Sequence, residues 1–299
     1  MKSLLGVSKR LALVLLLFCT GYGYAAASGL TNVYGYAKDA DGVRTGKPVV
    51  ARALEPHVMA VLASYFSASY GKHDPASNTW LTKVSDDYFT VSIRSIDRWQ
   101  TADMTRFYVV TEGRGRGDHP ENDFACHACH GLLGLLVLEM HDGKTEVIAS
   151  MLKIESGSWG DPAPGEWILL NDLAYYGYRT DSSYSGQGIT QTAVSVYAPY
   201  GKGFREILFL PVEYSDAGAR GDENATSIEA RLRVLLETEY GKVAPIEAHV
   251  AVSRPGSEKA GPTEETSLWL INFDEGTWKY RHPEKWPLDE AQLFPDLAP

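Results

Sequence analysis

The stretch Leu135-Leu136-Val137-Leu138-Glu139-Met140-His141-Asp142-Gly143-Lys144, continued by Glu146-Val147-Ile148, decides the fold. Two apolar runs flank an Asp-Gly pair, which is a strong signal of a two-residue β-hairpin turn. Similar short runs, rich in aromatic and β-branched residues, recur on both sides between Gly- and Pro-bearing turns. They lie at residues 88–93, 106–110, 167–170, 174–178, 193–197, 204–210, 228–236, 246–252, 268–273 and 278–280. The pattern predicts an all-β or β-dominated fold, a sandwich or open barrel of antiparallel hairpins.

One amphipathic helix is predicted near the N-terminus of this β-rich region. It begins after Glu55, and its apolar residues follow the spacing of a single helical face: Val58, Val61, Leu62, Tyr65 and Phe66. Pro56 suits the first helical turn, where its missing N–H is not needed. Gly71 suits the position that ends a helix. We expect this helix to pack on a sheet.

Other glycine-bearing and acidic segments are expected to be surface turns or loops. Residues 113–117, Gly-Arg-Gly-Arg-Gly, are expected to form a solvated loop, because no helix follows to complete a phosphate site. Residues 184–188, Tyr-Ser-Gly-Gln-Gly, lack the spacing of a nucleophile elbow and are expected to turn between two strands. The acidic segments 39–42 and 216–223 lack the alternating oxygen ligands of an EF-hand.

The first 27 residues carry the pattern of a secretory signal peptide. Lys2, Lys9 and Arg10 precede an apolar run over residues 11–18, and the small residues 25–27 provide an A-x-A cleavage site. The apolar run is shorter than the roughly 20 residues that a membrane-spanning helix needs. We therefore predict cleavage after residue 27 and a periplasmic or secreted protein, with residues 28–299 forming a single β-rich domain.

Charge limits the partners of the exported chain. The formal charge is −10, and removal of three basic residues without any acid would take it to −13. An acidic chain without a basic run is not expected to bind nucleic acid. No later stretch approaches the length of a membrane span, so we expect none after cleavage. Cleavage also removes Cys19 and leaves two cysteines, Cys126 and Cys129.

Both remaining cysteines lie in the pentapeptide Cys126-His127-Ala128-Cys129-His130. Cys-x-x-Cys-His is the attachment sequence of c-type haem. In this interpretation the two thiols form thioethers to the porphyrin vinyl groups, and His130 is the axial iron ligand. Residues considered for the sixth position are Met104, His119, His127, Met140 and Met151. A strand is predicted directly after the motif, whereas small cytochromes place it in a helix.

A disulfide between Cys126 and Cys129 is the second interpretation, because an exported protein meets an oxidising compartment. A thioredoxin-like enzyme would place the motif at the start of a βαβ helix, and the β-rich surroundings argue against that. The third interpretation is a zinc or copper site from both cysteines and two of His119, His127 and His130. The second half of a familiar zinc finger is absent, so this signal is weak.

Three segments of the chain also resemble a set of uncharacterised exported bacterial proteins. The shared pattern is Cys-His-x-Cys at 126–129 with an apolar strand from Gly131, Gly-Ser-Trp-Gly at 157–160, and the glycine turn at 184–188. In those proteins the residue after the second cysteine is usually not histidine, so the resemblance implies that His130 is a departure from the pattern. The resemblance brings no known activity.

The residues do not form a recognisable catalytic constellation, so whether the chain is an enzyme stays undecided. The favoured function is that of an exported, non-catalytic periplasmic protein with a Cys126–Cys129 disulfide loop and no cofactor. The alternative is a monohaem c-type protein, for electron transfer or haem sensing, with Cys126, Cys129 and His130 as its cofactor site and His130 as the metal ligand.

Overall fold

The computed structural model describes residues 30–38, 44–49, 54–119, 126, 129–236, 241–256 and 263–289. The predicted signal peptide, the acidic segment 39–42 and His127 lie outside these residues. Among the described residues, no helix has the length and apolarity to cross a membrane.

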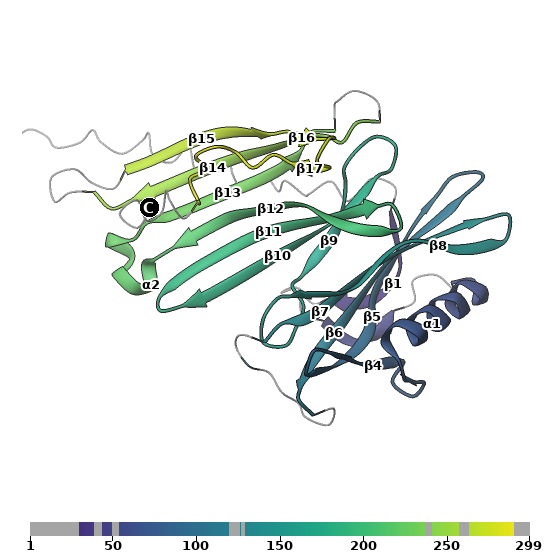
Figure 1. Cartoon of the computed structure of the whole chain (residues 1–299). Coiled ribbons are helices and arrows are strands. Elements are labelled where there is room, and N and C mark those ends of the chain that lie inside the picture. The colour runs from purple at the N-terminus through teal and green to yellow at the C-terminus, as the bar shows by residue number, and fades with distance from the viewer. Residues whose placement is uncertain are drawn as a thin grey trace, which may run out of the picture.

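Two large antiparallel sheets make up the protein, as the sequence predicted (Figure 1). The eight-stranded sheet has the order β2-β1-β5-β6-β7-β8, with β4 also on β5 and β3 on β4. Its strands are β1 (Thr31–Lys38), β2 (Arg44–Val49), β3 (His73–Asp74), β4 (Thr79–Val84), β5 (Asp87–Gln100), β6 (Thr105–Gly117), β7 (Gly131–His141) and β8 (Lys144–Ser156).

The seven-stranded sheet has the order β15-β14-β13-β12-β11-β10-β9. Its strands are β9 (Gly165–Leu169), β10 (Tyr176–Gly186), β11 (Ile189–Tyr200), β12 (Gly203–Ser215), β13 (Ser227–Val234), β14 (Ile246–Arg254) and β15 (Thr263–Ile271). A short hairpin of β16 (Phe273–Asp274) and β17 (Lys279–Tyr280) follows. Between β12 and β13 lie the short helix α2 (Ala217–Arg220) and a 3-10 turn, Asp222–Asn224.

The predicted N-terminal helix is confirmed as α1 (Pro56–Tyr70). Its buried residues, Val58, Leu62, Phe66 and Tyr70, recur every four positions and face the eight-stranded sheet. Pro56 occupies the first turn, and the N–H of Gly71, at φ 102°, closes the last turn on the Ser67 carbonyl. At this end the Tyr70 hydroxyl donates to the Leu152 carbonyl (2.8 Å) and lies 2.7 Å from the Thr111 hydroxyl.

Strand β7 is buried on both faces, which explains its continuous apolar sequence. Leu132, Leu136 and Leu138 point into the core beneath α1. Leu133, Leu135 and Val137 point to the other side, where the aromatic side chains Trp167, Tyr176 and Tyr178 of β9 and β10 cover the sheet. The eight-stranded sheet is therefore the middle of three layers, between α1 and part of the seven-stranded sheet.

The seven-stranded sheet has its own core on the face that the C-terminal segment covers. Strands β12 and β13 pair only through Glu213–Glu229 to Ser215–Ser227 and separate beyond that point (Figure 1). The fully buried Trp286 packs into this core, and its indole N–H donates to the Pro211 carbonyl (2.8 Å). Proline has no N–H for a strand ladder, so Pro211 suits a strand position without a β13 partner.

The predicted solvated loop at residues 113–117 is wrong, because these residues form the end of β6. The three glycines alternate with the arginines and are buried, as the period of a strand requires. A Cβ on Gly113 would lie 2.9 Å from Leu132 Cβ and 3.2 Å from Val91 Cγ2, so close strand packing excludes a larger residue.

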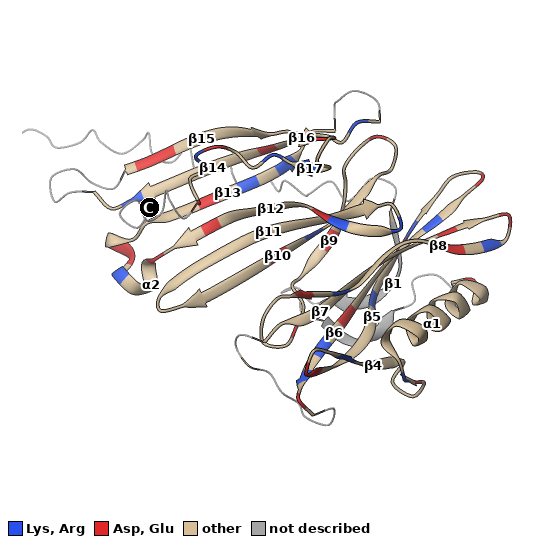
Figure 2. Cartoon of the chain, viewed as in Figure 1, with Lys and Arg blue, Asp and Glu red and all other residues tan. Residues whose placement is uncertain are grey.

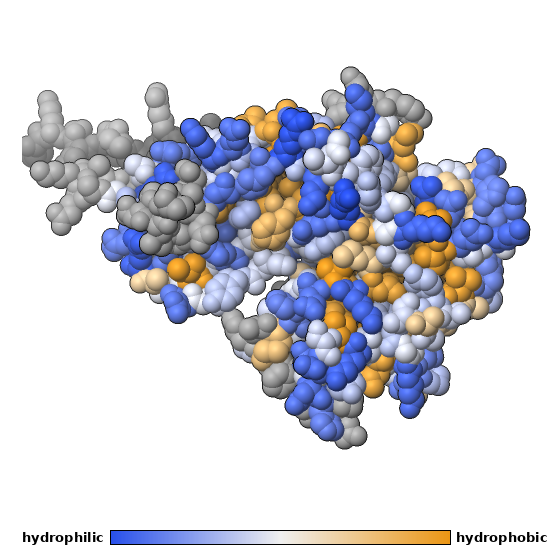
Figure 3. All heavy atoms as spheres, in the orientation of Figure 1, coloured by the Kyte–Doolittle hydropathy of each residue, from blue (hydrophilic) through white to orange (hydrophobic). Residues whose placement is uncertain are grey.

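The two predicted glycine turns are confirmed. Asp142 and Gly143 join β7 to β8 with φ 49° and 73°, and Gln187 and Gly188 join β10 to β11 with φ 53° and 80°. Positive φ at both central residues is typical of the tight hairpin turn that matches strand twist. Acidic and basic residues are interspersed over both sheets (Figure 2). On the face drawn in Figure 3, hydrophilic residues cover much of the surface and hydrophobic residues appear in separate groups between them.

Candidate functional site

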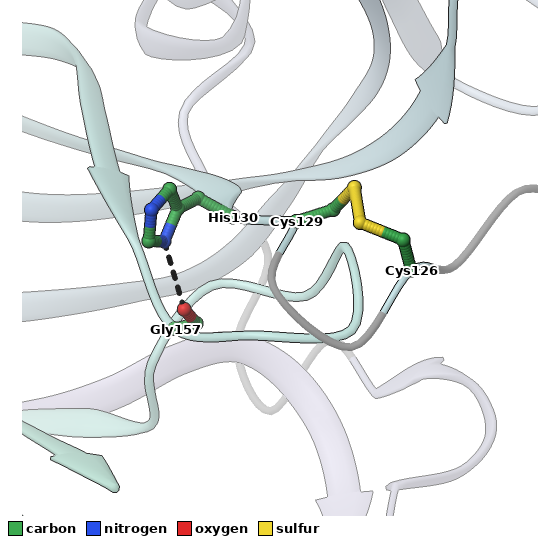
Figure 4. The surroundings of a disulfide bond; sticks show 4 residues. All are labelled: Cys126, Cys129, His130 and Gly157. Carbon is green, nitrogen blue, oxygen red and sulfur yellow. Dashed lines mark hydrogen bonds between the residues drawn. A yellow bond between two sulfur atoms is a disulfide. The ribbon is translucent and has the colours of Figure 1, made fainter. Parts of the chain in front are cut away.

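The cysteine pair lies between β6 and β7, at the end of the eight-stranded sheet (Figure 4). Cys126 and Cys129 are at disulfide distance, with 5.1 Å between their Cα atoms, and the N–H of Cys129 donates to the Cys126 carbonyl (3.0 Å). Both cysteines are partly exposed, and β7 begins directly after His130. The pair is therefore held in a tight turn at the surface.

The connection between β8 and β9 is hydrogen-bonded to this turn. Gly160 donates its N–H to the Cys129 carbonyl (2.8 Å), while Gly115 of β6 donates to the Gly160 carbonyl (2.8 Å). Gly157, Trp159 and Gly160 have φ values of 75°, 56° and 74°. These left-handed conformations curl the segment 157–161 into a compact turn, which suits glycine at two of the three positions.

Gly131 explains how closely the two connections approach. A Cβ on Gly131 would collide with the backbone of Asp161 and Pro162, so the start of β7 rests directly on the turn that follows β8. Only a residue without a side chain fits there. The end of the turn that holds Cys129 and His130 consequently packs against the segment 157–162.

His130 is exposed, and one of its two ring nitrogens is engaged. Nδ1 lies 3.0 Å from the Gly157 carbonyl oxygen (Figure 4). Because a carbonyl oxygen only accepts, the hydrogen is on Nδ1 in this contact, and a neutral ring then carries its lone pair on Nε2. A histidine held in this way by a backbone carbonyl has the arrangement that metal-ligating histidines usually show.

The structure separates the three methionines considered for a sixth iron ligand from His130, and one of them, Met151, pairs with Leu135 in the middle of β7. Met140 pairs with Thr105 at the opposite end of β7, roughly 30 Å from His130 along the strand. Met104 directly precedes the first residue of β6 and so lies at that same end of the sheet. The Met140 sulfur accepts from His57 Nε2 (3.2 Å). His119 lies just beyond the end of β6, at the same end of the sheet as His130.

Among the described residues no group of three or more His, Cys, Asp or Glu side chains could hold a metal ion. The zinc or copper interpretation relies in part on His127, which is outside those residues. It therefore stays an interpretation of the sequence.

Two features at the edge of the site were not identified as site residues from the sequence. Trp159 is 54% exposed although tryptophan is usually well buried, and it stands on the turn that supports Cys129. Beside it Arg114 Nε lies 2.8 Å from Asp161 Oδ1, an exposed ion pair that links β6 to the turn. The glycines that flank Trp159 at 157 and 160 are the sequence signal for this turn.

Of the three segments that carry the resemblance to exported bacterial proteins, the structure brings two together. Residues 126–129 and 157–160 are in direct contact through Cys129 and Gly160. The turn at 184–188 lies elsewhere, where Gly188 packs against Gly218 and Ala219 of α2. The first two segments thus form one structural unit, and the third is a separate hairpin turn.

The comparisons with known proteins add no family to this description. No family model, no curated protein and no solved structure matches the chain.

Proposed function

We propose that this chain is an exported, non-enzymatic binding protein in which a Cys126–Cys129 disulfide stiffens an exposed loop at the end of the eight-stranded sheet. The observation that supports this most is the hydrogen bond from Gly160 to the Cys129 carbonyl, made at a turn whose two cysteines are at disulfide distance. A pair of thiols so placed in an oxidising compartment is expected to pair.

The proposed role of the bond is local. A Cys-x-x-Cys bridge closes a very short loop, so it restricts the unfolded chain less than a long-range disulfide does. What it fixes is the shape of the surface between Cys126 and His130, which already rests on Gly160 and Gly157. A fixed loop loses less conformational entropy when a partner binds it.

Trp159 is the side chain that this surface would present to a partner. It is exposed on the supporting turn, and tryptophan is enriched among the residues that dominate binding energy at interfaces. The proposed partner surface therefore consists of the disulfide turn and Trp159, with Arg114 and Asp161 at its edge.

Two measurements on the expressed protein test this proposal. Export predicts a mature chain that begins at Ser28, which intact mass of the periplasmic protein would reveal. Stiffening predicts that limited proteolysis cuts within residues 118–130 faster in a Cys126→Ser/Cys129→Ser variant than in the parent protein. Equal rates of cleavage in the two proteins would contradict the stiffening role.

A monohaem c-type protein is the second proposal, and the engaged Nδ1 of His130 favours it. With Nδ1–H on the Gly157 carbonyl, Nε2 is the nitrogen that would face an iron. The test is an absorption spectrum and intact mass after expression together with haem-attachment machinery. The absence of both a Soret band and a mass increment would remove this proposal.

A further inference from the structure

A cavity of about 490 Å³ lies at the other end of the eight-stranded sheet from His130, where the two large sheets meet. We propose that this cavity binds a small apolar ligand that carries one positively charged, hydrogen-bond-donating group, as an aromatic or alkyl amine does. The site is separate from the disulfide turn, so this inference does not depend on the function proposed above.

The walls come from both sheets. Trp99 of β5 and Tyr176 of β10 supply aromatic rings, and Leu169, Leu173 and Leu236 supply aliphatic side chains. Leu173 and Leu236 are 48% and 37% exposed, so apolar surface is left open to solvent beside the cavity. Small-molecule sites in proteins commonly have this size and this mainly apolar lining, and often lie between structural units.

The segment 170–175, between β9 and β10, forms a rigid edge of the cavity. Asn171 is buried, and its Oδ1 accepts the N–H groups of Leu173 and Tyr175, both at 3.0 Å. Its Nδ2 donates to the Gly241 carbonyl (3.1 Å), and the N–H of Gly241 donates to Asp172 Oδ1 (2.8 Å). An edge held by four hydrogen bonds is ordered before any ligand arrives, which lowers the entropic cost of binding.

The backbone of Ala174, which also lines the cavity, has an unusual conformation. It has φ 57°, a left-handed conformation that is unfavourable for a non-glycine residue, and its carbonyl accepts from the buried Tyr108 hydroxyl (3.4 Å). Residues in such conformations concentrate at ligand sites, where the surrounding structure maintains them.

Charge at the cavity selects the ligand. Asp172 is the acidic residue among the described residues that line it, and one oxygen of its exposed carboxylate accepts from the N–H of Gly241. Arg106 lines the neighbouring cavity, where it bonds Glu139 (2.9 Å) and lies over the Trp99 ring at 5.7 Å. A cationic group would meet Asp172, while an anionic ligand would be repelled by it.

Leu173 separates the two cavities. It lines both the larger one and a neighbouring cavity of about 260 Å³ that also contacts Trp278. Because Leu173 is half exposed, a larger side chain can be placed there without disturbing the core. It is therefore the position at which the proposed site can be blocked.

The test uses two naphthalene probes of similar size, 1-naphthylmethylamine as the cation and 1-naphthoate as the anion, titrated into the full mature protein at pH 7. We expect saturable binding of the cation and weaker binding of the anion. Leu173→Trp should weaken binding of the cation at least about tenfold, a loss of about 1.4 kcal/mol. Leu268→Trp is the matched control, because Leu268 is 62% exposed on β15, and should bind as the parent does.

Asp172→Asn tests the charge and keeps an oxygen for the Gly241 N–H. It should weaken binding of the cation about threefold, the effect expected of one exposed charge interaction. The ratio of the affinity for the cation to the affinity for the anion should fall accordingly. The site is overturned if neither probe binds the parent saturably, or if Leu173→Trp and Leu268→Trp bind alike. Equal binding of the two probes to the parent would overturn the proposed ligand class.

Discussion

Gly160 donates its backbone N–H to the carbonyl oxygen of Cys129 across 2.8 Å, and this bond joins two connections that are far apart along the chain. One connection carries the cysteine pair between β6 and β7, and the other follows β8. Because Gly115 of β6 in turn donates to the Gly160 carbonyl, the turn at 157–161 connects the end of β6 to the segment that carries Cys129. The surface proposed for binding is therefore built on strand ends of the sheet.

Replacing Gly131 with alanine should destabilise the protein, because the added Cβ collides with the backbone of Asp161 and Pro162. Forced overpacking of this kind costs about 1–3 kcal/mol. Gly203→Ala is the control, since a Cβ there would have no neighbour closer than 3.8 Å. Urea unfolding of both variants measures the effect, and equal free energies of unfolding would contradict the packing described.

Removal of both cysteines should lower the free energy of unfolding by less than removal of a long-range disulfide does. For so short a loop the chain-entropy estimate is at most about 2 kcal/mol, so Cys126→Ser/Cys129→Ser should fold and unfold cooperatively. Thermal unfolding of this variant and of the parent, each without reductant, measures the difference. A variant that fails to fold would show that the pair stabilises the whole domain and not only the turn.

Gly134 makes room for the hydrogen bond between Tyr70 and Thr111, since a Cβ there would collide with both hydroxyl oxygens. Gly134→Ala should cost about 1–3 kcal/mol. Tyr70→Phe should also cost about 1–3 kcal/mol, because it removes a buried hydrogen-bonding hydroxyl. In the Tyr70→Phe background one of the two collisions is absent, so Gly134→Ala should cost less there. Strict additivity in urea unfolding would contradict this account.

Burial raises the pKa of Tyr108 from 10.0 to about 12, which outweighs the opposing effect of Arg106. A raised pKa in the folded state means that folding favours the neutral phenol. Its contribution to stability is complete below pH 10 and is lost as the pH rises towards 12.

Tyr108→Phe should therefore lose less stability between pH 10 and 12 than the parent does. Urea unfolding across this range, compared with Tyr184→Phe at an exposed tyrosine, measures it. Identical pH profiles for the two variants would refute the prediction.

Trp286 should be required for the stability of the seven-stranded sheet. Trp286→Phe removes the donor to the Pro211 carbonyl and leaves that oxygen without its indole partner, which costs about 1–3 kcal/mol. Trp159→Phe, at a tryptophan that is 54% exposed, should change stability by less than about 0.5 kcal/mol. Thermal unfolding of both variants gives the comparison, and a larger effect at Trp159 would be contrary to the fold described.

Local signals predicted the helix, most of the longer strands and two hairpin turns, but not every element of the fold. The helix from Pro56 and the hairpin turns at Asp142-Gly143 and Gln187-Gly188 each depend on residues within a few positions, and the structure has all three. Residues 113–117 were mispredicted because glycines and arginines suit a loop as well as a strand. What decides between them is contact with Leu132 and Val91, which no local pattern contains.

The candidate site was only partly predictable for the same reason. The pentapeptide marks Cys126, Cys129 and His130 by their own chemistry. Its support comes from Gly157 and Gly160, which reach it only because β7 and β8 pair and return the chain to the same end of the sheet. The cavity beside Leu173 likewise needs residues from β5, β9, β10 and the segment after β13, so no single segment predicts it.

Alkylation of the purified, denatured protein, followed by intact mass, tests the proposed Cys126–Cys129 disulfide most directly. A Cys126–Cys129 disulfide predicts no label without reductant and two labels after reduction. Thioether-bound haem would instead block labelling both before and after reduction and add the mass of the porphyrin. Two labels on the unreduced protein would show free thiols and contradict the account.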